Sequence, residues 1–216
     1  MDIKKPVAAL FDLDGVILDT ESQYDIFWAE QGRRYLPHIE NFHKLVKGQT
    51  IKQMFDNYFV GMDEAQKQIR IDIDIFEENM SYEFIPGVEA FISGLKDNNV
   101  RIAIVTSSNN LKMTSVYSAH PELKEWFSTI ITANRITHSK PDPECFQVAA
   151  ADLGVDPDNC FVFEDSFHGL QAGNAAGMTV IGLATTNSRE AITDKAHHII
   201  DNFNDFTFEK LIQVSK

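Results

Sequence analysis

Short, largely apolar runs recur along the chain, and most are followed at once by a polar cluster. The runs lie at residues 7–11, 101–105, 129–132, 160–163 and 179–182. Runs of this length and composition are typical of strands that are buried on both faces of a parallel sheet. Between them, helical spacing or helix-ending glycines predict helices at 88–96, from about 111, up to Gly154 and up to Ala176. Alternating strands and helices predict an α/β fold with a doubly wound parallel sheet.

Residues 17–82 show a different pattern, which is almost wholly helical. Thr20 and Gln23 have the spacing of a capping box, which predicts a helix that begins near Thr20. The isoleucines of residues 63–80 alternate as in a strand, but the length and charged flanks of this segment favour a helix. We therefore expect an all-helical domain at 17–82, inserted into a core domain made of residues 1–16 and 83–216.

The chain of 216 residues is acidic, with a formal net charge of −13 and a pI of about 4.9. Nucleic acids and anionic membranes attract basic surfaces, so neither is an expected partner. No window approaches 18 apolar residues, and Asp12 follows the first apolar run too early for a signal peptide, so we expect a cytoplasmic protein. The two cysteines, Cys145 and Cys160, are expected to be reduced core residues. A monomer is the default expectation.

Two acidic residues, Asp12 and Asp14, stand at the end of the first apolar run, and Gly15 follows them. Carboxylates at a buried strand end are costly to desolvate unless a cation or a hydrogen-bond network compensates. Such a pair could bind Mg²⁺, or supply a nucleophile and a general acid. The alternative is an ordinary strand end with an Asp-Gly turn.

Polar residues also follow later strands or precede a helix, in the order Thr106-Ser107-Ser108, Lys140 and Glu164-Asp165. Each cluster could instead be a helix cap or, for Lys140, an ordinary surface residue. The carboxyl ends of parallel strands lie along one edge of the sheet, so all of these groups are expected to meet in one crevice. Their joint order favours a functional site.

In these motifs the chain resembles the haloacid dehalogenase superfamily, within its β-phosphoglucomutase-like branch of phosphatases and phosphosugar mutases. The matching segments are Asp12-Leu-Asp14-Gly15-Val16 with Asp19-Thr20-Glu21, then Thr106, Lys140-Pro141-Asp142-Pro143, and Glu164-Asp165-Ser166 with the glycines and alanines up to Gly177. The resemblance implies a Rossmann-like core, with residues 17–82 as a cap that moves on hinges near 16–20 and 82–87.

The resemblance also implies roles for single residues. Asp12 would be the nucleophile that forms an aspartyl-phosphate, and Asp14 the general acid and then the general base. Mg²⁺ would be held by Asp12, Glu164 and Asp165, together with the backbone carbonyl of Asp14. Thr106 would bind phosphate oxygens, and Lys140 would neutralise their charge. Further substrate-facing candidates are Gly15, Ser107, Ser108 and Asn109 in the core, and Tyr24, Gly48, Gln49, Thr50 and Lys52 in the cap.

Three positions separate the phosphatases of this branch from its mutases. Tyr24 and Ile51 stand where the mutases carry His and Arg, and Asn109 stands where they carry Lys. The resemblance therefore favours a Mg²⁺-dependent phosphatase acting on a small phosphorylated metabolite, with sugar phosphates among the candidates. A phosphosugar mutase and a non-catalytic binding module on the same fold are the alternatives.

Overall fold

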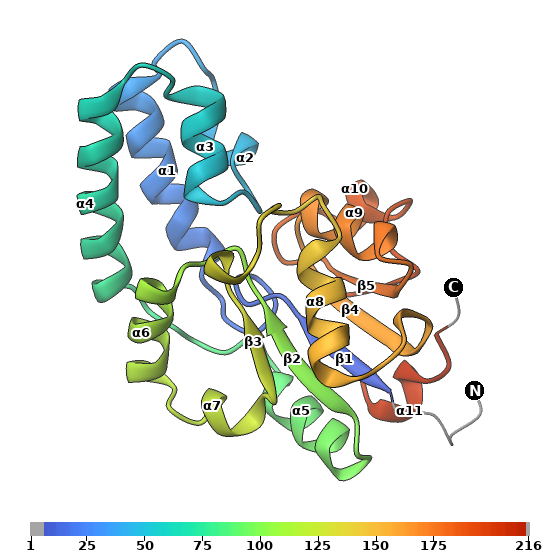
Figure 1. Ribbon diagram of the computed structural model, residues 1–216. Coiled ribbons are helices and arrows are strands. Elements are labelled where there is room, and N and C mark those ends of the chain that lie inside the picture. The colour runs from blue at the N-terminus through green and yellow to red at the C-terminus, as the bar shows by residue number, and fades with distance from the viewer. Residues whose placement is uncertain (1–6, 215–216) are drawn as a thin grey trace.

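The computed structural model describes residues 7–214 and contains a six-stranded parallel sheet in the order β3-β2-β1-β4-β5-β6 (Figure 1). The strands are β1 (Ala8–Phe11), β2 (Arg101–Val105), β3 (Thr129–Ile131), β4 (Cys160–Glu164), β5 (Thr179–Leu183) and β6 (His198–Ile200). The five predicted strands are confirmed, and β6 is an addition. The strand order reverses between β1 and β4, which is where open α/β sheets bind their ligands.

Helices cover both faces of the sheet, as the alternating pattern predicted. Along β1, Ala9 and Phe11 face one apolar cluster and Ala8 and Leu10 face the other. The first cluster includes residues from α5 (Val88–Asp97), α6 (Asn110–Ala119), α7 (Leu123–Trp126) and α11 (Phe208–Leu211). The second includes residues from α8 (Glu144–Leu153), α9 (Phe167–Ala175) and α10 (Arg189–Ile192), with both cysteines. The doubly wound fold is confirmed.

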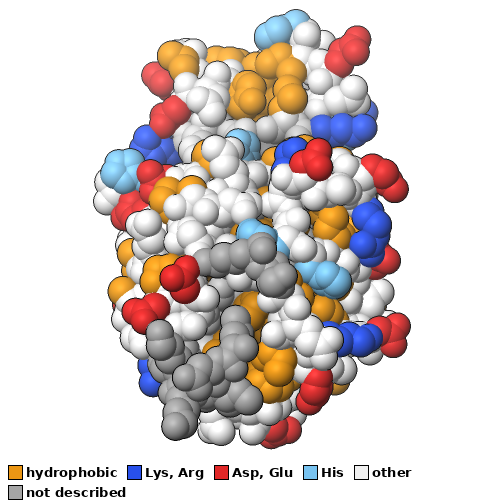
Figure 2. Space-filling model, turned by 90° about the vertical axis from the view of Figure 1, so that its right-hand side faces the viewer, with side chains coloured by type: hydrophobic (Ala, Val, Ile, Leu, Met, Phe, Trp, Pro, Cys, Tyr) orange, Lys and Arg blue, Asp and Glu red, His pale blue; other side chains and the backbone are white. Residues whose placement is uncertain are grey.

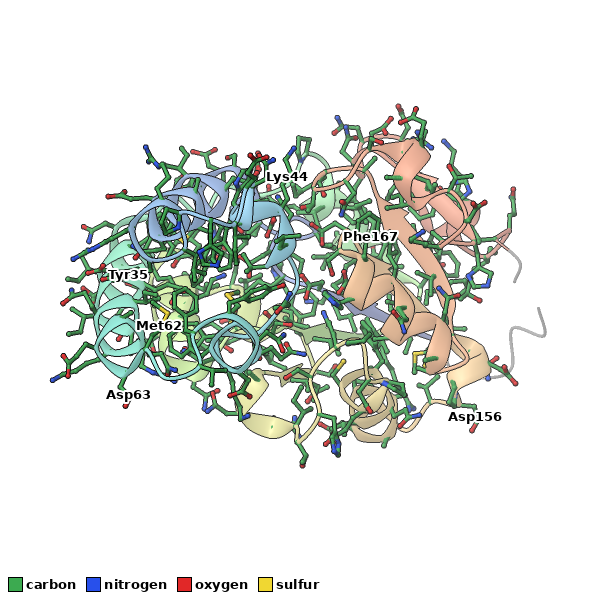
Figure 3. All side chains as sticks on the ribbon, turned by 90° about the horizontal axis from the view of Figure 1, so that it is seen from above. Tyr35, Lys44, Met62, Asp63, Asp156 and Phe167 are labelled. Atoms are coloured by element: carbon green, nitrogen blue, oxygen red, sulfur yellow. The ribbon has the colours of Figure 1, made fainter. Side chains whose placement is uncertain are left out.

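A separate group of helices stands at one end of the sheet (Figure 1). It consists of α1 (Glu21–Tyr35), α2 (Phe42–Leu45), α3 (Ile51–Tyr58) and α4 (Asp63–Asn79), which pack around an apolar cluster of their own. Seen from above, Tyr35, Met62 and Asp63 of this group lie opposite Phe167 and Asp156 of the core (Figure 3). Because α4 covers Asp63–Asn79, the ambiguous segment at 63–80 is a helix. The four helices form a helical cap that stands on a Rossmann-like core.

The predicted capping box at Thr20 is wrong. The Thr20 side chain makes no cap hydrogen bond to α1, because its hydroxyl donates instead to Asp14. Gln23 exchanges two hydrogen bonds of 2.9 Å with the backbone of Ser81. A capping box forms at the start of α3, where Thr50 and Gln53 satisfy each other's backbone N–H groups.

The charged side chains on the surface are distributed as the acidic composition leads one to expect. On the face shown in Figure 2, basic side chains are interspersed with acidic ones and form no continuous stripe. Within residues 7–214, none of the helices combines the length and apolar character needed to cross a membrane.

Candidate active site

A cavity of about 400 Å³ lies between the cap and the strand ends. Its lining includes the predicted groups Asp12, Asp14, Thr106, Ser107, Ser108, Asn109, Lys140, Glu164 and Asp165, and the cap residues Tyr24, Gly48, Gln49, Thr50 and Lys52. Gly15, the remaining predicted residue, lies next to them: a Cβ atom there would stand 2.0 Å from Oδ2 of Asp165. The structure thus brings the sequence-predicted residues together around one cavity.

Lys140 lies at the centre of a buried ionic cluster. Its ammonium donates to Asp12 Oδ1 at 2.6 Å, to Glu164 Oε1 at 2.5 Å and to the carbonyl of Val105 at 3.1 Å. These three acceptors match the three N–H donors of a lysine. Lys140 thereby joins the ends of β1, β2 and β4, and its hydrogen bond to Asp12 is made to one oxygen, Oδ1.

The burial of these groups changes how they titrate. Burial raises the pKa of Asp12 to about 7; Lys140 opposes this shift, whereas Glu164 and Asp14 add to it. Burial alone would lower the pKa of Lys140, but Asp12 and Glu164 raise it above its usual range, so the ammonium stays charged. The positive charge of Lys140 therefore offsets only part of the negative charge of the surrounding carboxylates.

The third carboxylate of the cluster belongs to Asp165. Burial raises its pKa well above the usual value, and Glu21, Glu164 and Asp12 add to this shift. Ligand oxygens of Asp12, Glu164 and Asp165 all lie within 4.8 Å of one another. Oxygen donors at this spacing suit a hard divalent cation, and the excess of negative charge favours one. The residues therefore fit a Mg²⁺ ion.

Glu164 is held in place by its surroundings. Its Oε2 accepts hydrogen bonds of 3.0 Å from the backbone N–H groups of Asp165 and Ser166 and from the Ser166 hydroxyl. A Cβ atom on Gly169 would lie 1.8 Å from Oε1, so α9 approaches the carboxylate closely. Glu164 is fully buried, and both of its oxygens accept hydrogen bonds.

The carboxylate of Asp14 has three donors and lies outside the cation cluster. Thr20 and Ser108 each donate a hydroxyl, the latter at 3.1 Å, and the ammonium of Lys112 lies 2.5 Å from both oxygens. The sequence predicted a contact between the Asp14 backbone carbonyl and the metal, and that contact stays a prediction.

The residues after β2 have distinct local roles. The hydroxyl of Thr106 accepts from the Ser108 backbone N–H at 3.0 Å, and the side chain of Asn109 caps α6 by accepting from the Lys112 N–H at 2.9 Å. Ser107 donates its hydroxyl to the carbonyl of Gly48 in the cap, at 3.3 Å. The loop therefore shapes the cavity floor and also contacts the cap.

The turn before α3 rests on the core. Gln53 donates to the carbonyl of Lys140 at 2.8 Å, and the His168 ring lies 3.3 Å from the carbonyl of Lys47. Gly48 is so close to the core that a Cβ atom there would lie 2.6 Å from the Ser166 hydroxyl. The cap therefore contacts the core directly beside the strand ends.

Sequence reasoning missed several charged residues of the cavity lining, among them Lys47, Glu77 and Lys112. Lys47 bridges Glu21 and Asp25 at 3.1 and 2.8 Å, Lys112 pairs with Asp14, and Glu77 accepts from the Tyr24 hydroxyl at 2.7 Å. Lys112 and Glu77 lie inside helices, where a charged residue is ordinarily solvent-facing. The spacing around Lys112 and Glu77 carried no signal that could have identified them.

Comparison with known proteins agrees with this geometry. Residues 9–183 match the family model of the haloacid dehalogenase-like hydrolases. The chain belongs to this family. It is 29% identical to the "Probable pseudouridine-5'-phosphatase" of Drosophila melanogaster over 220 residues, which cover 96% of this chain and 94% of that protein. It is 26% identical to the β-phosphoglucomutase of Bacillus subtilis, covering 82% of each chain.

The fold also matches solved structures of this family. A family IA, variant 3 hydrolase from Entamoeba histolytica superposes with a TM-score of 0.83 at 25% sequence identity, covering 96% of this chain and 98% of that one. The family assignment that the motifs implied is confirmed by the family model and by the fold.

Proposed function

We propose that this protein is a Mg²⁺-dependent phosphatase that hydrolyses a small phosphorylated metabolite through an aspartyl-phosphate on Asp12. The observation that carries the proposal is the Asp12 carboxylate, which has Lys140 on one oxygen and two further buried carboxylates beside it. This arrangement supplies a nucleophile, a fixed cation and a metal site at one strand end. The similarity to a named phosphatase supports the reaction class.

In the proposed reaction, Asp12 attacks phosphorus and the bond to the ester oxygen breaks. Asp14 gives a proton to the leaving oxygen, then takes one from the water that attacks the phosphoryl group on Asp12, which releases inorganic phosphate. Lys140 and the loop that begins with Thr106 bind the phosphoryl oxygens. A Mg²⁺ ion held by Asp12, Glu164 and Asp165 would supply the remaining positive charge.

Water as the acceptor is supported by the charges around the cavity. The lysines of the cavity lining, Lys47, Lys52, Lys112 and Lys140, each contact a carboxylate, and Asn109 uses its side chain to cap α6. Arg70 is the exception and lies over the Phe55 ring. A mutase holds a second phosphate in its cap, for which these paired lysines offer little positive charge. With a hexose 1-phosphate and a bisphosphate primer, phosphate release should exceed isomer formation.

The proposed function is tested with p-nitrophenyl phosphate and Asp12→Asn. We expect the wild type to turn over in Mg²⁺, to lose activity in EDTA and to regain it when Mg²⁺ is restored. Asp12→Asn should abolish turnover. Asp152→Asn is the matched control, since Asp152 pairs with Arg135 at 2.8 Å and does not line the cavity. An Asp12→Asn variant that keeps its turnover would contradict the nucleophile assignment.

A further inference from the structure

Lys112 is a buried lysine to which the proposed reaction assigns no role. Its side chain is 2% exposed, although it stands in the first turn of α6, next to the cavity. A lysine is almost never fully buried unless it is paired, because the ammonium loses its hydration. Lys112 must therefore be held by specific partners.

The first partner is Asp14. The Lys112 ammonium lies 2.5 Å from both oxygens of this carboxylate, and the hydroxyls of Thr20 and Ser108 donate to Oδ1 and Oδ2 respectively. Of the three donors, Lys112 is the charged one, and charge-assisted hydrogen bonds are about twice as strong as neutral ones. Lys112 therefore contributes most to fixing where the Asp14 carboxylate lies.

The second partner is the ring of Tyr24, in the cap. The Lys112 ammonium lies 4.6 Å from the ring centroid, within the range of a cation–π contact. The Tyr24 hydroxyl donates to Glu77 of α4 at 2.7 Å, which fixes the ring. A continuous set of contacts therefore runs from Asp14 in the core, through Lys112, to two helices of the cap.

We propose that Lys112 is a positioning residue that holds the Asp14 carboxylate for proton transfer and ties it to the cap through Tyr24. This inference rests on the proposed function, in which Asp14 protonates the leaving oxygen. With Lys112 removed, Asp14 keeps two neutral donors and can rotate, so its proton reaches the leaving oxygen less often. A purely structural ion pair would stabilise the fold without affecting proton transfer.

Two substrates of nearly equal shape separate these possibilities. Phenyl phosphate releases a strongly basic phenolate, which needs a proton as it leaves, whereas p-nitrophenyl phosphate releases a weakly basic one. The ratio of kcat/KM for p-nitrophenyl phosphate to that for phenyl phosphate reports on the general acid. We expect Lys112→Met to raise this ratio about tenfold, within the effect ascribed to general acids.

The variant set is wild type, Lys112→Met, Asp14→Asn, the double variant and Lys124→Met. If Lys112 acts through Asp14, the double variant should have the ratio of Asp14→Asn, with no further increase. The matched control is Lys124→Met, which removes a lysine of α7 whose ammonium lies 4.4 Å from the centroid of the Tyr117 ring, and it should leave the ratio unchanged.

The outcomes are distinct for the two proposals. A wild type without activity on either substrate contradicts the proposed function itself. If the wild type is active, two results would overturn the positioning role. One is that Lys112→Met loses the same fraction of kcat/KM on both substrates. The other is that the effects of the two substitutions on the ratio add up in the double variant. If Lys112→Met does not fold by circular dichroism, the double variant still decides. It lacks both charges of the buried pair, and a ratio above that of Asp14→Asn overturns the inference.

Discussion

Glu77 is a carboxylate buried in the cap, where its effect on stability should depend on pH. It is 7% exposed, and burial raises its pKa, while Lys112 and the hydrogen bond from Tyr24 oppose the shift. Between the unfolded and the folded pKa, the native state binds the proton that the unfolded state releases. Stability therefore falls as pH rises through this window.

We predict that Glu77→Gln stabilises the protein more at pH 8 than at pH 5. Glutamine keeps an acceptor for the Tyr24 hydroxyl and removes the buried charge. The gain should grow as pH rises, because the ionised form of the buried glutamate is the one that burial disfavours. Urea unfolding at both pH values measures it, with Glu78→Gln, the exposed neighbour on α4, as the control. A larger gain at pH 5 would show that the carboxylate is a net stabiliser.

The place of some residues in the candidate site could be predicted from the sequence, and that of others could not. Asp12, Lys140 and Glu164 were predictable because each stands in a motif at or near a strand end, and parallel strands bring those ends to one edge. Lys112 could not be predicted as a site residue, because it lies 98 positions from Asp14 along the chain. Only the packing of α6 brings the two side chains together. Thr20 was assigned to a helix cap, but the tertiary contact with Asp14 takes its hydroxyl.

At the scale of elements, the turn before α3 joins the cap to the core. Gly48 has φ +74° and lies against Ser166, whereas Gly61 has φ +75° and no atom within 4 Å of the Cβ position. Replacing either by alanine should cost a similar backbone penalty of about 1–2 kcal/mol, because both lie in the left-handed region. The two sites differ in the clash with the core.

We predict that Gly48→Ala lowers turnover of p-nitrophenyl phosphate about tenfold or more, since the added methyl pushes the turn off the core and opens the cavity to water. Gly61→Ala should lose a similar free energy of unfolding and keep its turnover. Steady-state kinetics and urea unfolding of both variants give the comparison. Equal turnover in the two variants would mean that this contact does not matter for the reaction.

The elements themselves were largely predictable because local patterns agree with the fold. Buried parallel strands need apolar side chains on both faces, so β1, β2 and β4 appear as apolar runs. Strand β6 was missed, because its three residues begin with an exposed histidine and lie at the edge of the sheet. The capping box of α3 was also missed, although Thr50 and Gln53 carry its spacing.

At the scale of the whole molecule, charge is distributed unevenly between surface and interior. The formal net charge is −13, and three carboxylates are buried at the sheet edge beside one lysine. Bringing them together in the folded state costs free energy, because the unfolded chain keeps them apart and hydrated. A divalent cation that binds the native state would offset this cost.

We predict that Mg²⁺ raises the Tm of the metal-free protein, by a stabilisation of about 2.7 kcal/mol at a concentration one hundred times the Kd. Calorimetry in KCl of equal ionic strength removes the contribution of general screening. Asp165→Asn should reduce the Mg²⁺ shift strongly. The control is Asp142→Asn, which alters a second group of possible ligands, His138, Asp142 and Glu144, of which the first two are exposed, and it should keep the shift. A Tm shift no larger in Mg²⁺ than in KCl would contradict the prediction. It would mean that Lys140 and the hydrogen bonds around the cluster offset the cost of burying the carboxylates without a divalent cation.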